Sequence, residues 1–140
     1  MKKKKRWLRR LLIFAVILLV YPVFVIGYTW THVLQSDLEG GRHGPLDAYR
    51  HALASAVVSH TLGEWAVDLV TTVFESSGKD TNQMDRKNNT IGASIGRRSG
   101  SFGELEATVR RSVLAGAELS TDSNQITWLP EDRWRDSKLW

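Results

Sequence analysis

Hydrophobic residues follow two different patterns along this chain. Residues 11–30 read LLIFAVILLVYPVFVIGYTW, and no charged residue occurs from Leu11 through Ser36. From Pro45 onward, apolar and polar residues alternate with the period of amphipathic helices, and the strict alternation that strands require is nearly absent. The pattern predicts an all-α protein, with one N-terminal transmembrane helix followed by a small bundle of three or four helices.

The long apolar segment has the length and the flanks of a transmembrane helix. About 20 apolar residues cross a hydrocarbon core of ~30 Å, and Trp7, Tyr28 and Trp30 stand where interfacial aromatic residues are expected. A cleaved signal peptide is the alternative, but its apolar region is usually only about 7 to 15 residues long. We therefore favour an uncleaved signal-anchor and a single-pass membrane protein.

These boundaries divide the chain into four parts. They are a basic tail (1–10), the transmembrane helix (11–30), a short linker (31–44), and an extracytoplasmic helical domain with an irregular, Trp-rich tail (45–140).

Charge is distributed unevenly between these parts. The first ten residues hold seven of the 19 Lys and Arg and no acid, whereas the remaining 130 hold 12 basic and 15 acidic residues, a net charge of −3. The positive-inside rule places the N-terminus in the cytoplasm and the domain outside the cytoplasmic (inner) membrane, in the periplasm of a Gram-negative cell. Because the basic excess is confined to the tail, we expect the lipid bilayer as a partner and no nucleic acid. The chain has no cysteine, which excludes disulfides and thiolate metal sites.

Proline, glycine and capping residues set the expected helix boundaries within the domain. The first helix should run from Pro45 to about Leu62, and the second over residues 64–76, before Gly78. A third is expected near 84–98 with a capping box from Asp80, and a fourth over 104–120 with a capping box from Ser101.

Polar side chains gather on one face of two of these helices. Asp47 and His51 are four residues apart, and Asp85, Asn88 and Asn89 also share a face because they are spaced by three and four. Gly92 and Gly96 keep one side of that third helix small, although each glycine costs about 1 kcal/mol in a helix.

Two interpretations of these polar residues stay open. In the functional one, His51, Glu75, Asp85 and Asn89 bind a divalent metal ion, or His51 is a general base that Asp47 and Asp85 orient. In the structural one, the same residues form surface pairs and favour a helix dipole. His43 lies in a Gly-flanked segment and is assigned no role, although it could swing towards such a site.

Two motifs resemble an uncharacterised family of small bacterial helical domains, found in secreted or surface-associated proteins. They are GPLDAYRHA (44–52) and MDRKNNTIG (84–92), which correspond to D-A-[FY]-R-H-A and M-D-x-x-N-N-x-x-G. The resemblance covers roughly residues 44–97 and marks Asp47, Arg50, His51, Asp85, Asn88, Asn89 and Gly92. Family members also have a helix ending in His-Glu; Glu75 matches the glutamate, but Phe74 stands in place of the histidine.

These observations predict a membrane-anchored envelope protein with a His/Asp/Asn/Glu site that is hydrolytic or metal-binding. If the protein is an enzyme, we expect a hydrolase that acts near the membrane, on phospholipid or cell-wall material. The alternative is a non-enzymatic envelope protein that binds a partner through the transmembrane helix or the tail.

Overall fold

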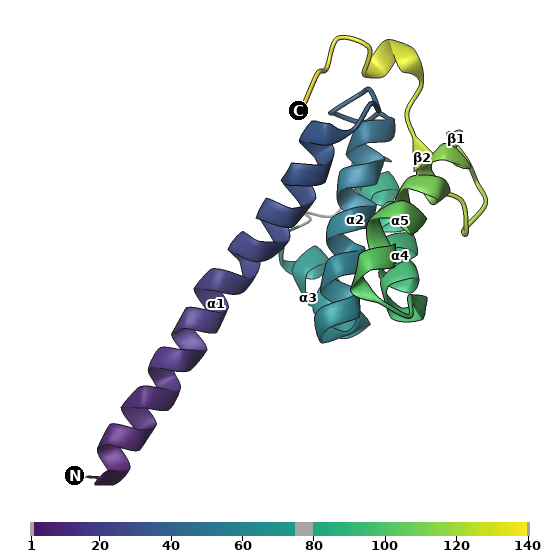
Figure 1. The fold of residues 1–140 in the computed structure, drawn as a ribbon. Helices are drawn as coiled ribbons and strands as arrows, with labels where there is room; N and C mark the ends of the chain where they lie inside the picture. Colours follow the sequence, from purple (N-terminus) through teal and green to yellow (C-terminus); the bar gives the residue numbers. More distant parts are fainter. Residues whose placement is uncertain (1, 75–79, 140) are drawn as a thin grey trace.

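A long N-terminal helix is joined to a bundle of shorter helices (Figure 1). The computed structural model describes residues 2–74 and 80–139. Its elements are α1 (Lys2–Gln35), α2 (Pro45–Leu62), α3 (Glu64–Phe74), α4 (Asp80–Arg98), the 3-10 helix η1 (Phe102–Glu104), α5 (Leu105–Leu114), strands β1 (Ala117–Glu118) and β2 (Thr127–Trp128), and the 3-10 helix η2 (Glu131–Arg133). The predicted all-α architecture is confirmed.

Helix α1 is apolar and long enough to span a membrane, but it continues five residues beyond the predicted end. No helix-breaking residue occurs in the segment THVLQ, so the irregular connection begins only at Ser36. The first part of α1 projects away from the bundle, while its last part packs alongside α2 (Figure 1). Val25 and Val33 are buried in that contact, and the hydroxyls of Tyr21 and Thr61 are 2.5 Å apart.

Helix α2 is the centre of the bundle, because α1, α3, α4 and α5 all pack against it. It begins and ends where the sequence predicts, with Pro45 in its first turn and Gly63 at its C-cap, where φ is +102°. Tyr49, Leu53 and Val57 of α2 are almost completely buried, together with Leu105, Val109 and Val113 of α5.

The closest contact in the bundle joins α2 and α4, which run side by side in the same direction. A Cβ added to Gly92 would lie 2.2 Å from the carbonyl oxygen of Ala52, and one added to Gly96 would lie 2.2 Å from that of Ala56. The small side predicted for this helix is therefore the surface on which α2 rests.

The chain after η1 departs from the predicted fourth helix. The capping box from Ser101 makes no side-chain cap hydrogen bond, and α5 ends at Leu114 rather than near residue 120. A Cβ on Gly116 would lie 2.5 Å from the Trp128 ring, so the returning tail occupies the space into which the helix would continue. The tail instead pairs β2 with β1 in a short parallel ladder, a feature that the hydrophobic pattern does not predict.

We predict that Gly92→Ala destabilises the protein. Alanine is favoured over glycine in a helix by about 1 kcal/mol, but the new methyl group would collide with backbone atoms of Ala52, and overpacking of this kind costs about 1–3 kcal/mol. Thermal unfolding of the full chain in detergent, followed by circular dichroism, should show a lower midpoint. Gly103→Ala is the matched control, since no atom lies within 4 Å of its added Cβ; equal midpoints for both variants would contradict the close α2–α4 contact.

Candidate functional site

Three of the predicted site residues converge at the start of α2 and α4. The His51 Nε2 atom lies 3.5 Å from Asp47 Oδ1 and 3.7 Å from Asp85 Oδ1. All three ligand atoms lie within 4.8 Å of one another. Helical spacing places Asp47 and His51 on one face of α2, and the parallel register of α4 brings Asp85 opposite them. We name these three residues the Asp–His–Asp cluster.

The cluster opens to solvent through the imidazole. The Asp47 side chain is 4 % exposed, Asp85 17 % and His51 30 %. A buried carboxylate thus lies at the base of the site, and the groups able to meet a ligand lie nearer the surface.

The two imidazole–carboxylate distances are longer than direct hydrogen bonds, whose donor and acceptor atoms are usually about 2.7–3.2 Å apart. They match the separation of two ligands of one metal ion: atoms about 2.1 Å from Zn²⁺ in tetrahedral geometry are ~3.4 Å apart. The geometry can therefore hold one small divalent cation, or orient His51 as a base between two carboxylates.

Arg50 balances part of the negative charge of the cluster. Its guanidinium donates a hydrogen bond to Asp47 Oδ1 and another, of 3.0 Å, to the carbonyl oxygen of Leu139. The same group lies 5.5 Å from the centre of the Trp30 ring. Two carboxylates and one guanidinium leave a formal charge of −1, so a proton on His51 would neutralise the site, whereas a divalent cation would make it +1.

His43 adds a second imidazole beside Asp47. Its backbone N–H donates a 2.6 Å hydrogen bond to Asp47 Oδ2, and its Nδ1 lies 3.9 Å from the same oxygen. Among the described residues, no hydrogen-bond partner is found for this buried nitrogen. Burial lowers the pKa of His43, although the negative charge of Asp47 acts in the opposite direction. The lowered pKa favours the neutral imidazole, which is the form that binds a metal ion. From the sequence alone His43 has no assigned role, although its four-residue spacing from Asp47 is a signal that could identify it.

His43 also adopts a backbone conformation that is uncommon for a residue with a side chain. Its φ is +67°, in the left-handed region. The hydrogen bond to Asp47 and a 2.9 Å bond from the Leu129 N–H to the His43 carbonyl oxygen hold it there.

The other predicted residues lie outside the cluster. Asn89 is buried one turn further along α4, where its Oδ1 accepts a 3.0 Å hydrogen bond from the Ser55 hydroxyl. Asn88 pairs with the backbone of Thr127, and Gly92 provides the close contact with α2. Glu75 lies outside the described residues. Of the predicted metal set, the structure brings His51 and Asp85 together, with Asp47 as the third converging group, and places Asn89 one turn away.

The C-terminal tail packs over the loop that precedes α2. The Trp134 ring lies against Gly40 and Gly44, and the Leu139 backbone lies against Gly41, so that a Cβ on any of these glycines would collide with the tail. The tail is therefore docked on the bundle, at the end where α1 finishes and α2 begins (Figure 1).

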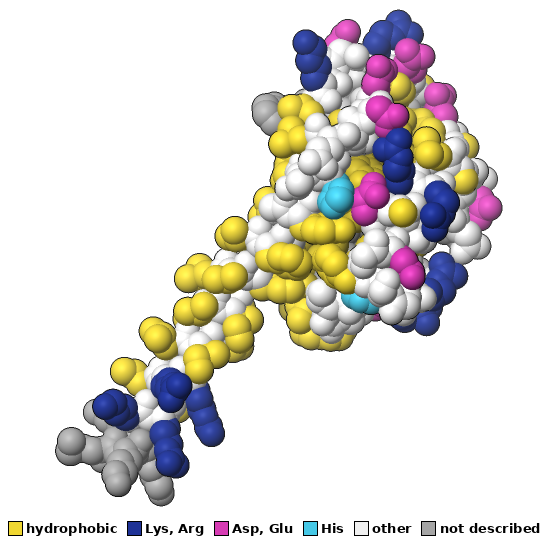
Figure 2. Space-filling view, viewed as in Figure 1, with side chains coloured by type: hydrophobic (Ala, Val, Ile, Leu, Met, Phe, Trp, Pro, Cys, Tyr) yellow, Lys and Arg dark blue, Asp and Glu magenta, His cyan; other side chains and the backbone are white. Residues whose placement is uncertain are grey.

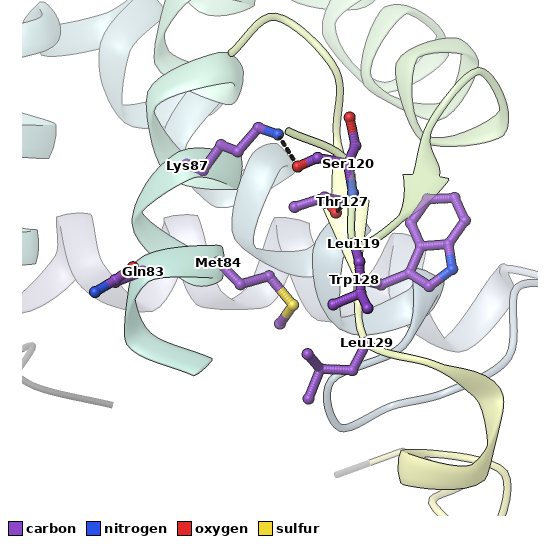
Figure 3. Close-up of a pocket in the computed structure, with 8 residues that line it drawn as sticks. All are labelled: Gln83, Met84, Lys87, Leu119, Ser120, Thr127, Trp128 and Leu129. Carbon is purple, nitrogen blue, oxygen red and sulfur yellow. Dashed lines mark hydrogen bonds between the residues drawn. The ribbon is translucent and has the colours of Figure 1, made fainter. Parts of the chain in front are cut away.

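A separate cavity of about 310 Å³ lies between α4 and the tail. Figure 3 shows its apolar side chains (Met84, Leu119, Trp128, Leu129) and the 2.8 Å hydrogen bond from Lys87 Nζ to the Ser120 carbonyl oxygen. Its lining residues do not include any member of the Asp–His–Asp cluster, and none is a carboxylate.

Comparisons with known proteins return no match, whether to a family model, a curated protein or a solved structure. The resemblance described from the two motifs therefore stays a prediction.

We predict that Asn88→Ala releases the tail from α4. Asn88 is fully buried, donates a 2.8 Å hydrogen bond to the Thr127 carbonyl and accepts one of 3.0 Å from its N–H. Leaving two buried backbone groups without partners should cost about 2–6 kcal/mol, at 1–3 kcal/mol for each group. Chemical unfolding of the full chain measures this loss. Asn124→Ala, at an exposed turn, is the control, and its free energy of unfolding should stay within about 0.5 kcal/mol of that of the wild type. An equally small change for Asn88→Ala would contradict the role of Asn88 in holding the tail against α4.

Proposed function

We propose that this chain is a single-pass membrane-anchored envelope protein whose external bundle binds a divalent cation through the Asp–His–Asp cluster. Helix α1 is the anchor, with the basic tail in the cytoplasm. A bound cation would act as a Lewis acid and activate water, so hydrolysis is the reaction class that the site supports best.

The observation that carries the cation proposal is the pair of distances at His51. Nitrogen and oxygen atoms 3.5 and 3.7 Å apart are too far for strong hydrogen bonds, but suit ligands of a shared ion. One imidazole with two carboxylates is a donor set that suits Zn²⁺ or Mn²⁺, and His43 is close enough to Asp47 to extend it.

The anchor proposal rests on the composition of α1 and its flanks. The helix carries a 31-residue candidate span from Lys5 to Gln35, and only 6 % of its apolar 18-residue window is buried within the protein. Apolar side chains that remain exposed over such a length require a partner other than water, and the basic residues before them favour a cytoplasmic N-terminus.

One observation favours a non-enzymatic second candidate. Asp47 already receives hydrogen bonds from Arg50 and from the backbone of His43, so it also braces the loop before α2. In that case the cluster would fix helix packing, and the protein would act through a partner. The cation experiment separates the two functions.

We predict that the full chain, stripped with a chelator and kept in detergent, binds Zn²⁺ or Mn²⁺ with one site in calorimetric titration. His51→Ala and Asp85→Asn should each weaken binding at least about tenfold, since even outer-shell substitutions cost 10–100-fold. His60→Gln is the matched control, because His60 lies on the same helix but contacts the Gly96 carbonyl instead. Equal binding by the wild type and His51→Ala, or none by either, would favour the bracing function.

We predict that Leu19→Arg releases the protein from the membrane. A charge at the centre of a span costs about 2.5–3.5 kcal/mol on insertion scales, and Leu19 is 72 % exposed in the apolar part of α1. Alkaline extraction of membranes should leave the wild type and a Leu114→Arg control in the pellet.

Intact mass then tests cleavage, because an uncleaved chain has the full 15.8 kDa, and a shorter, extractable product would indicate a signal peptide.

A further inference from the structure

The end of the bundle where α2 passes into α3 carries an exposed apolar surface. Leu62, Trp65, Leu69 and Val70 are 45 %, 65 %, 56 % and 47 % exposed. Two arginines, Arg97 and Arg98, lie at the C-terminal end of α4, and the 3.1 Å ion pair between Arg97 and Glu64 ties that end to the start of α3. We name these six residues (Leu62, Trp65, Leu69, Val70, Arg97, Arg98) the foot of the bundle.

The foot lies next to the point where α1 leaves the bundle. The Tyr21–Thr61 contact fixes the end of α2 at the level of Tyr21, and α1 projects beyond this end (Figure 1). Figure 2 shows that the hydrophobic side chains of α1 continue onto the adjacent part of the bundle. The apolar surfaces of the helix and of the bundle therefore form one region.

The length of the free part of α1 determines what this region meets. From Trp7 to Val20 there are 14 residues, which span about 21 Å at a rise of 1.5 Å per residue. A hydrocarbon core is ~30 Å thick. The free part of α1 is therefore too short to cross the bilayer unless the membrane thins locally or the adjoining bundle enters the outer part of the membrane. Either adjustment brings the foot into contact with lipid.

We infer that the foot is a second membrane contact, seated in the outer leaflet of the bilayer that α1 crosses. This inference rests on the proposed anchor. Trp65 has the amphipathic ring that favours the interface, the aliphatic side chains of α3 meet acyl chains, and the two arginines extend towards lipid phosphates. Lipid is favoured over a protein partner because the foot lies at the end of the bundle beyond which the candidate span projects.

The chain has no cysteine, so single cysteines can carry a spin label for depth measurement. Leu69→Cys reports on the foot, and Val16→Cys on the span. Leu114→Cys is the matched control: it is 63 % exposed and lies at the end of α5 away from the foot. The labelled full chains are placed in nanodiscs of phosphatidylcholine and phosphatidylglycerol, and collision with oxygen, which concentrates in lipid, is compared with collision with a water-soluble nickel chelate.

We expect labels at Leu69 and Val16 to collide more often with oxygen than with the nickel chelate. The label at Leu114 should collide more often with the nickel chelate than with oxygen. A Leu69 label that behaves like Leu114, with Val16 in lipid, would overturn the inference and leave the anchor intact. A Leu69 label shielded from both reagents would assign the foot to a protein partner or a second copy. A Val16 label in water would overturn the anchor itself.

The arginines are tested separately. In the same nanodiscs, the double variant Arg97→Gln, Arg98→Gln should shift the Leu69 label towards nickel and leave the Val16 label unchanged. An unchanged Leu69 label would contradict the contact between the arginines and lipid phosphates.

Discussion

The close approach of α2 and α4 is the constraint on which the rest of the bundle depends. Backbone contact at Gly92 and Gly96 fixes both the separation and the register of the two helices. In that register, polar groups meet at successive turns: His51 opposite Asp85, Ser55 opposite Asn89, and the Ser59 hydroxyl on the Ala93 carbonyl. The Asp–His–Asp cluster contains the first of these contacts, nearest the N-terminal ends of α2 and α4. The distances between its side chains therefore follow from the packing of the two helices.

The buried carboxylate of Asp47 links the cluster to distant parts of the chain. A buried charge is costly unless it is paired and hydrogen-bonded, and Asp47 meets this requirement through Arg50 and the His43 backbone. Arg50 in turn contacts Trp30 of α1 and the Leu139 carbonyl of the tail. The end of the long helix, the loop before α2 and the C-terminal tail therefore converge on one ion pair, and any ligand that competes for Asp47 acts on all three.

The features that could be predicted from the sequence depend on residues close together in the chain. Pro45 and Gly63 gave the bounds of α2, the spacing of Asp47 and His51 gave their shared face, and the glycines of α4 gave its small side. The missed features depend on long-range contacts. The end of α5 and the β1–β2 ladder are set by Trp128 and by the pairing of Asn88 with Thr127, 39 residues away. His43 was missed because it precedes α2, so its four-residue spacing from Asp47 did not indicate a shared helix face.

The positions of the foot and of the cluster bear on the substrate. They lie at opposite ends of α2, and the 15 residue steps from Asp47 to Leu62 rise about 22 Å at 1.5 Å per residue. With the foot seated in the outer leaflet, the cluster would lie ~20 Å above the foot. The packing of α1 against α2 would keep the bundle in this orientation. A phospholipid in the same bilayer is then out of reach. The geometry favours cell-wall or soluble envelope material over lipid as the substrate of any hydrolysis at His51.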